Sequence, residues 1–331
     1  MDALETPEHS DGHPAVQSTA FRASISTYKN KIHPIIIYPF SHPKDTVHVR
    51  WLFDNLIGPI AADSNRYAKP ITVLNRQTHY ANTHWRYDPM LNAEFAKFRV
   101  DYLERHSRVI DAWCVDTCQM WLAGFGAAYD EQEGAGDCYW LIPGDFDYAI
   151  GDGPSVIKIL PNLPDIVIAG QDICLGEIDV PINSSKQLID TYGTYGLLYN
   201  WFPHEAQQLR RTIDKPRTEF FAISHSFLRE VLRQRWFAYE QTIVILLQAI
   251  LGKKRIHKEK LGQISDLPQG RDTLSAAMQQ VERTERVLKL FWRERNQQQS
   301  DWSERFKKLD IQSGQIRGAA LVILENLLVY S

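Results

Sequence analysis

The chain has 331 residues and a mass of 38.2 kDa, which at roughly 150 residues per domain suggests two domains, or one large domain with an appendage. Hydrophobic residues make up 44% of the chain and charged residues 23%, a composition that excludes disordered, collagenous and disulfide-scaffold proteins. Thirty-seven basic and forty acidic side chains leave a net charge of −3, so the chain has no global positive field with which to bind a nucleic acid.

The N-terminal segment 1–34 is predicted to be a disordered tail. It begins with a mixture of Glu, His, Pro and Ser and lacks the apolar run of a signal peptide. The most apolar stretches, at 242–250 and 319–330, are shorter than the roughly 20 residues that a membrane span needs. None of the four cysteines forms a CxxC pair, which fits a reducing compartment. We therefore expect a soluble, cytoplasmic protein.

The first half of the chain alternates strand-like and helix-like segments. Short apolar, β-branched blocks predict buried strands at 35–38, 71–74 and 138–142. Apolar residues recur with a helical period over 47–61, and helical spacing over 90–129 predicts one or two further helices. Because strands and helices alternate, the order predicts a parallel sheet with helices on both faces.

The second half is predicted to be richer in helices. Apolar runs predict strands at 165–169 and 219–223, with an amphipathic helical region at 184–211 between them. Heptad-like spacing with many charges over 272–295 and 303–330 indicates a helical C-terminal part.

The residues that could carry chemistry are few, because the common loop signatures are absent. The chain contains no GxGxxG, GxxxxGK[ST], HExxH or GxSxG motif, so classical dinucleotide, P-loop, zincin and nucleophile-elbow sites are not expected. A pair of acids, Asp145 and Asp147, directly follows an apolar strand. Ligands of open parallel sheets bind beyond the carboxyl ends of the strands, and two such carboxylates can hold a hard cation that binds phosphate oxygens. The alternative is that these acids cap turns and face water.

Four stretches, taken in order and spacing, resemble a known family. They are IIIYPF at 35–40, DFD at 145–147, QLIDTYGTYGLLYNWFP at 187–203, and the run from 218 to 267. Together they resemble the GT-A-fold nucleotide-sugar glycosyltransferases and, within these, the retaining mannosylglycerate synthase group. The resemblance implies a GT-A-like (Rossmann-like) α/β fold, with a mostly parallel sheet flanked by helices in a catalytic domain over 35–275 and a helical extension over 276–331.

The resemblance also implies roles for individual residues. Asp145 and Asp147 would bind Mg²⁺ or Mn²⁺, and Asp266 could replace the family's late metal-ligand histidine as an oxygen ligand. Two acids, Glu219 and Glu240, would lie on the sugar and acceptor side as catalytic residues. The nucleotide-binding set would comprise Pro39, Phe40, Arg76, Asp116 and Asp145, with Pro39 and Phe40 at the base. The basic, glycine-rich nucleotide loop of the family is replaced by RVIDAWCVDT at 108–117, which has no lysine.

These patterns predict a metal-dependent glycosyltransferase that moves a sugar from a nucleoside diphosphate sugar to a small hydroxylated acceptor with retention. One alternative is a phosphohydrolase in which Asp145 is the nucleophile and Asp147 the acid. Another is a non-catalytic GT-A-like binding protein. His257, in the run KKRIHKEK, is expected on an exposed basic helix end rather than as a ligand. No nucleic-acid or membrane partner is expected, and association into a homo-oligomer is left open.

Overall fold

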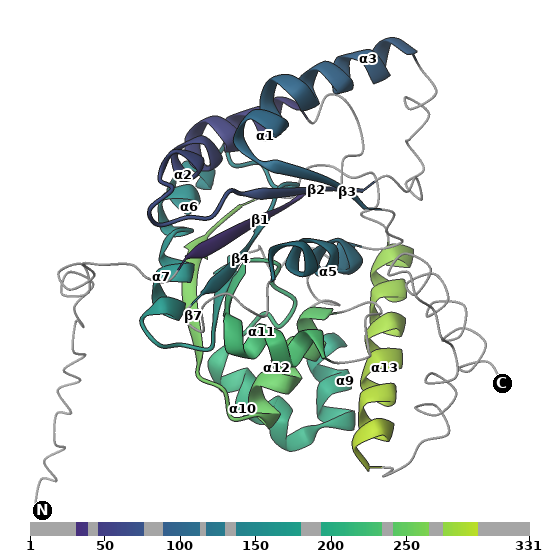
Figure 1. The fold of residues 1–331 in the computed structure, drawn as a ribbon. Helices are drawn as coiled ribbons and strands as arrows, with labels where there is room; N and C mark the ends of the chain where they lie inside the picture. The colour runs from purple at the N-terminus through teal and green to yellow at the C-terminus, as the bar shows by residue number, and fades with distance from the viewer. Residues whose placement is uncertain are drawn as a thin grey trace, which may run out of the picture.

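The computed structural model describes residues 31–38, 46–75, 89–112, 117–129, 137–179, 193–233, 241–264 and 274–296. These residues form one mixed sheet with helices packed on both faces (Figure 1). The domain division expected from the sequence stays a prediction, since segments 1–30 and 297–331 lie outside this description. Residues 32–34, which were expected to belong to the disordered tail, instead form the start of a buried strand.

The sheet has the strand order β3-β2-β1-β4-β6-β5-β7. Its strands are β1 (Ile32–Tyr38), β2 (Ile71–Asn75), β3 (Arg108–Ala112), β4 (Cys138–Pro143), β5 (Ile173–Ile178), β6 (Phe221–Ser224) and β7 (Ile256–Gly262). Neighbouring strands are parallel, except that β6 runs antiparallel to both β4 and β5. Strand β6 therefore begins at the edge of the sheet where the other strands end.

Two groups of helices cover the two faces of the sheet (Figure 1). On one face lie α1 (Thr46–Leu52), the π-helical turn η3 (Phe53–Ile57), α2 (Gly58–Ala62), α3 (Pro89–Phe98), the π-helical turn η5 (Arg99–Leu103), α4 (Glu104–His106), α6 (Gly153–Ile159) and α7 (Asn162–Ile168). On the other lie α5 (Thr117–Ala128), α9 (Thr194–Trp201), α10 (Pro203–Thr212), α11 (His225–Leu232), α12 (Gln241–Leu251) and α13 (Leu274–Asn296).

Strand β1 separates the two hydrophobic cores. Ile35 and Ile37 pack into the core under α5, whereas Ile36 and Tyr38 pack into the core under α1 and α6. Every residue of β1 is buried, because alternate side chains of a central strand point to opposite covered faces. This double burial explains why the strand reads as a continuous apolar run rather than an alternating one.

Most of the predicted elements are confirmed. The strands expected at 35–38, 71–74 and 138–142 are β1, β2 and β4, and the helical segment at 47–61 comprises α1, η3 and α2. The strand expected at 219–223 is β6, which begins at Phe221, and α13 confirms the first C-terminal helix.

Three sequence-based expectations were wrong. The span 90–129 is not helical throughout, because strand β3 lies between α4 and α5. Segment 165–169 belongs to α7, and the strand follows later, as β5; Pro164, in the first turn of α7, is at a position where a helix tolerates proline. His257 lies on strand β7 and not at a helix end.

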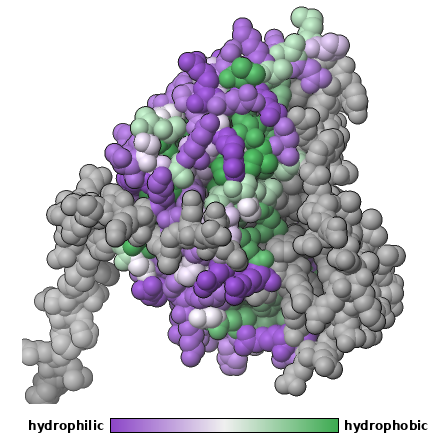
Figure 2. All heavy atoms as spheres, in the orientation of Figure 1, coloured by the Kyte–Doolittle hydropathy of each residue, from purple (hydrophilic) through white to green (hydrophobic). Residues whose placement is uncertain are grey.

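The surface is polar with scattered apolar side chains. Hydrophilic residues cover most of the described part of the face seen in Figure 2. The exposed large hydrophobic residues include Met90 on α3, Ile150 before α6 and Trp292 on α13, and such single apolar residues are normal on a protein surface. None of the described helices is both long enough and apolar enough to cross a membrane.

Candidate active site at the carboxyl edge of the sheet

The strand order switches sides at β1: β2 and β3 lie on one side of it, and the next strand, β4, lies on the other. Open α/β sheets bind ligands beyond the strand ends at such a switch point. The Gly144 amide donates a hydrogen bond to the Ile37 carbonyl at 2.7 Å, and a Cβ atom at Gly144 would lie 2.9 Å from that same oxygen. A glycine therefore lets the chain leaving β4 stay close to the end of β1, with Asp145 and Asp147 immediately beyond it.

Asp147 is held by two protein groups. Its Oδ2 atom lies 3.3 Å from Nδ1 of His48 on α1, and its Oδ1 atom accepts a hydrogen bond from the Ala149 amide at 3.1 Å. The residue is 8% exposed. These contacts fix the direction of the carboxylate, because both of its oxygen atoms have a partner from the chain.

Tyr148 closes the loop that carries the two acids. Its hydroxyl donates a hydrogen bond to the Pro143 carbonyl, and only 1% of the residue is exposed. Burial, followed by the negative charges of Asp145 and Glu219, raises the pKa of Tyr148 well above its usual range. The loop is therefore closed by a phenol that stays protonated.

A second contact brings the same two segments together. The ring of Phe146, between the two acids, packs on the ring of Phe220 with centroids 4.8 Å apart. Glu219 directly precedes Phe220 at the start of β6, which enters the sheet beside β4. Asp145 and Glu219 are both partly buried. The antiparallel direction of β6 thus delivers Glu219 to the carboxyl edge next to the two aspartates.

We expect Tyr148→Phe to lower the free energy of unfolding by about 1 kcal/mol, the usual contribution of one buried hydrogen bond. The ring would still fill its place, but the loop of residues 143–148 would lose its closing contact. If this loop binds a metal and a nucleotide, as the sequence predicts, the affinity for nucleotide in the presence of Mn²⁺ should fall several-fold. Thermal denaturation and isothermal titration calorimetry measure the two effects, and an unchanged nucleotide affinity would show that the hydroxyl does not order the loop.

Three of the predicted site residues, Asp145, Asp147 and Glu219, are thus brought to one edge of the sheet. The other predicted residues lie outside the described parts of the chain and stay predictions: Pro39, Phe40, Arg76, Asp116, Glu240 and Asp266. Within the described residues no group of three or more His, Cys, Asp or Glu side chains is arranged to hold a metal ion. The two aspartates offer only carboxylate oxygens, a donor set that fits a hard cation such as Mg²⁺ or Mn²⁺.

Three features of this site were not predicted. His48 faces Asp147, Tyr148 closes the acid loop, and the Phe146–Phe220 contact joins the loop to β6. Tyr148 had a signal, since it directly follows the acid pair and an aromatic residue there is suited to burial. His48 had none, because one polar residue on an amphipathic helix indicates only a solvated face.

Comparisons with known proteins identify the fold. No protein-family model matches the sequence, and no curated protein matches it either. Among solved structures, glucosyl-3-phosphoglycerate synthase from Mycobacterium tuberculosis in complex with phosphoglyceric acid is similar, with 14% identity, 77% of this chain and 78% of that chain covered, and a TM-score of 0.51. A structure described as a mycobacterial protein has 12% identity, 78% and 74% coverage, and a TM-score of 0.49.

The synthase is a GT-A nucleotide-sugar glycosyltransferase related to mannosylglycerate synthase. The GT-A-like fold expected from the sequence, a mostly parallel sheet flanked by helices, is therefore confirmed. At 14% identity the likeness concerns the fold, and the chemistry has to be argued from the residues of this chain.

Proposed function

We propose that this protein is a metal-dependent glycosyltransferase that moves a sugar from a nucleoside diphosphate sugar to a small hydroxylated acceptor, with retention of configuration. The observation that carries the proposal is the packing of Phe146 on Phe220, which brings the segments of Asp145 and Glu219 together at the switch point of a GT-A-like sheet. The fold similarity to a glucosyl-3-phosphoglycerate synthase supports the same class of reaction. The cysteine usage fits a reaction in a reducing compartment such as the cytoplasm.

In this proposal Asp145 and Asp147 hold a divalent cation, with Asp266 as a third oxygen ligand. The cation, when bound, would neutralise negative charge on the diphosphate leaving group. His48 keeps the Asp147 carboxylate in one orientation, and Tyr148 keeps the loop closed on Pro143. Both contacts exist before any ligand arrives, which reduces the reorganisation that binding requires.

Glu219 would act on the sugar and acceptor side by accepting hydrogen bonds from hydroxyl groups, and Glu240 would orient the acceptor hydroxyl. Pro39 and Phe40 would contact the base, with Arg76 and Asp116 as further nucleotide-binding residues. Because the similar synthase was solved with phosphoglyceric acid, phosphorylated hydroxy acids are the first acceptors to test.

A thermal-shift panel of nucleoside diphosphate sugars, with and without Mn²⁺, tests the proposal. A ligand that binds only the folded state raises the apparent melting temperature, so at least one donor should stabilise the protein in a metal-dependent way. Release of the nucleoside diphosphate then measures sugar transfer to phosphoglyceric acid and to other hydroxy acids. If no nucleotide binds with Mn²⁺ present, the protein would be a non-catalytic member of the fold. Metal-dependent cleavage of a generic phosphate ester would instead indicate the phosphohydrolase.

Asp266→Ala is expected to lower metal affinity without changing the melting temperature of the metal-free protein, since a ligand supports the ion rather than the core. A set of three carboxylates should also make Zn²⁺ a poor activator relative to Mg²⁺ or Mn²⁺. Calorimetric titration with Mn²⁺ and with UDP, used as a representative nucleoside diphosphate, measures the affinity, and Asp266→His should recover part of it. Unaltered affinity in Asp266→Ala would exclude this residue from the ligand set.

A further inference from the structure

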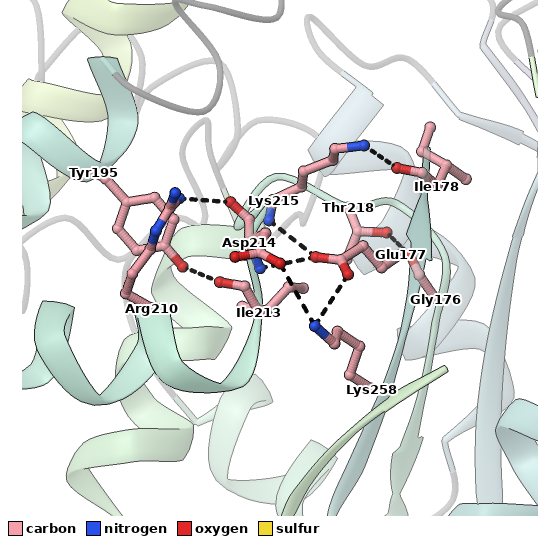
Figure 3. A network of polar contacts seen from close by, with 10 residues as sticks. All are labelled: Gly176, Glu177, Ile178, Tyr195, Arg210, Ile213, Asp214, Lys215, Thr218 and Lys258. Atoms are coloured by element: carbon pink, nitrogen blue, oxygen red, sulfur yellow. Dashed lines mark hydrogen bonds and ion pairs between the residues drawn. The ribbon is translucent and has the colours of Figure 1, made fainter. Parts of the chain in front are cut away.

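An ionic network centred on one buried carboxylate lies at the end of β5, outside the acid pair of the candidate site (Figure 3). Its centre is Glu177, which is 5% exposed. The Oε1 atom of Glu177 accepts hydrogen bonds from the amides of Asp214 at 2.8 Å and Lys215 at 3.2 Å. The Oε2 atom lies 3.1 Å from Nζ of Lys258 on β7. One buried carboxylate thus joins β5, β7 and the segment that connects α10 to β6.

The connecting segment, residues 213–220, contains Glu219 near its end and is held at several further points. The Thr218 hydroxyl donates to the Gly176 carbonyl at 2.5 Å, and the Tyr195 hydroxyl donates to the Ile213 carbonyl at 2.5 Å. The Lys215 ammonium donates to the Ile178 carbonyl. Burial lowers the pKa of Lys215 below its usual value. Figure 3 shows that the Lys258 side chain and the backbone of Asp214 and Lys215 reach Glu177 itself. The Thr218 and Lys215 side chains instead reach the backbone carbonyls on either side of it. The segment is therefore fixed on both sides of its middle by contacts to β5.

The packing beside Glu177 leaves little freedom for the segment. A Cβ atom on Gly176 would lie 2.6 Å from Cδ1 of Leu261 and 2.8 Å from Cβ of Phe220. The Gly176 amide donates to the Phe220 carbonyl at 2.7 Å. Strand β5 thus contacts both the backbone and the side chain of Phe220, which follows Glu219 in the sequence and packs on Phe146. Glu219 therefore lies between two residues, Thr218 and Phe220, that both contact Gly176, the neighbour of Glu177.

We propose that Glu177 is a positioning residue that sets the place of Glu219 in the active site by fixing residues 213–218. This inference rests on the proposed function for its effect on the reaction. A carboxylate suits the task better than an amide, because it can accept both backbone amides and still balance the charge of Lys258. Glu177→Gln removes the charge of the buried carboxylate and leaves Lys258 with Asp214, at 3.7 Å, as its acidic partner. The variant should therefore loosen the segment without removing side-chain volume.

The test compares Glu177→Gln, Lys258→Met and the double variant with a matched control, Glu230→Gln. Glu230 also pairs with a lysine, Lys254 at 2.6 Å, but at the amino edge of the sheet. We expect the affinity of Glu177→Gln for UDP in the presence of Mn²⁺ to stay within about twofold of the parent value. Its kcat for sugar transfer should fall about tenfold to 100-fold, the scale of a small misplacement of a reacting group. The double variant should recover part of kcat, because the lysine charge that Glu177 balances in the parent is then removed together with the carboxylate.

Hydrogen exchange separates this inference from the proposed function. In Glu177→Gln the amides of residues 214, 215 and 218–220 should exchange faster than in the parent and in Glu230→Gln, whether or not the protein transfers a sugar. A parent protein without nucleotide binding or transfer would overturn the proposed function alone. If Glu219→Gln lowers kcat but Glu177→Gln keeps the parental kcat, the positioning role would be overturned. Parental exchange of these amides would overturn it as well.

Discussion

Asp145→Asn should abolish metal-dependent nucleotide binding while leaving the fold intact. The side chain lies at the rim of the sheet and is partly buried, so the substitution removes a charged oxygen ligand and almost no core volume. Changes to groups that only orient a metal ligand cost about tenfold to 100-fold in metal affinity, and the loss of a ligand itself should exceed that. Calorimetric titration of UDP in the presence of Mn²⁺ measures the effect, and Asp147→Asn should behave in the same way.

The matched control for these variants is Asp165→Asn. Asp165, on α7, is also partly exposed and pairs with Arg66, but it lies away from the carboxyl edge. Its amide variant should bind the nucleotide with parental affinity. Parental affinity in Asp145→Asn as well would exclude the acid pair as the metal site. A nucleotide that binds equally well without the metal would point to a different site for the diphosphate.

Phe146→Ala should lower both the stability of the protein and its affinity for the nucleotide. The side chain is 6% exposed and packs on Phe220, and truncation of a core phenylalanine costs about 3–5 kcal/mol. The same contact joins the acid loop to the segment of Glu219, so its loss should also let the two groups of carboxylates drift apart. Chemical denaturation measures the stability, and titration with UDP and Mn²⁺ measures the affinity below the unfolding transition.

Phe98→Ala separates the two effects. Phe98, on α3, is 1% exposed and belongs to the same core, so its truncation should cost a similar free energy. It has no ring contact with the acid loop; its ring neighbours are Phe95 and Tyr102. We expect nucleotide affinity to be retained in this variant. Equal losses of affinity in both variants would mean that general stability, rather than the Phe146 contact, controls binding.

The part of the fold that could be predicted is the part in which local pattern and final environment agree. Strands β1 and β4 are buried on both faces, and a buried strand reads as a short β-branched or apolar run. Strand β7 was missed because it is an edge strand, where lysines discourage pairing with other chains. Its charges resemble those of a helix end. Strand β3 lies at the other end and was hidden within a longer helical spacing.

The acid pair at 145–147 could be predicted because its neighbours in the sequence are also its structural context: a buried strand, a glycine and a turn. The contribution of Glu219 could be assigned only through a family resemblance, since its place depends on the direction of β6. Glu177 could not be predicted. A single acid at the end of an apolar run indicates a strand end facing water, and only the tertiary structure brings the amides of residues 214 and 215 and Lys258 to it.

The position of β4 in the sheet has a consequence for biosynthesis. All six residues of β4 are buried, with β1 on one side and β6 on the other. During translation β1 and β4 emerge well before β6, so β4 is for a time the outermost strand, with one row of unpaired amides and carbonyls. An exposed apolar strand edge of this kind promotes intermolecular association. A ribosome-bound nascent chain that ends between β5 and β6 should therefore recruit holdase chaperones and aggregate after release, whereas one that extends past β6 should not.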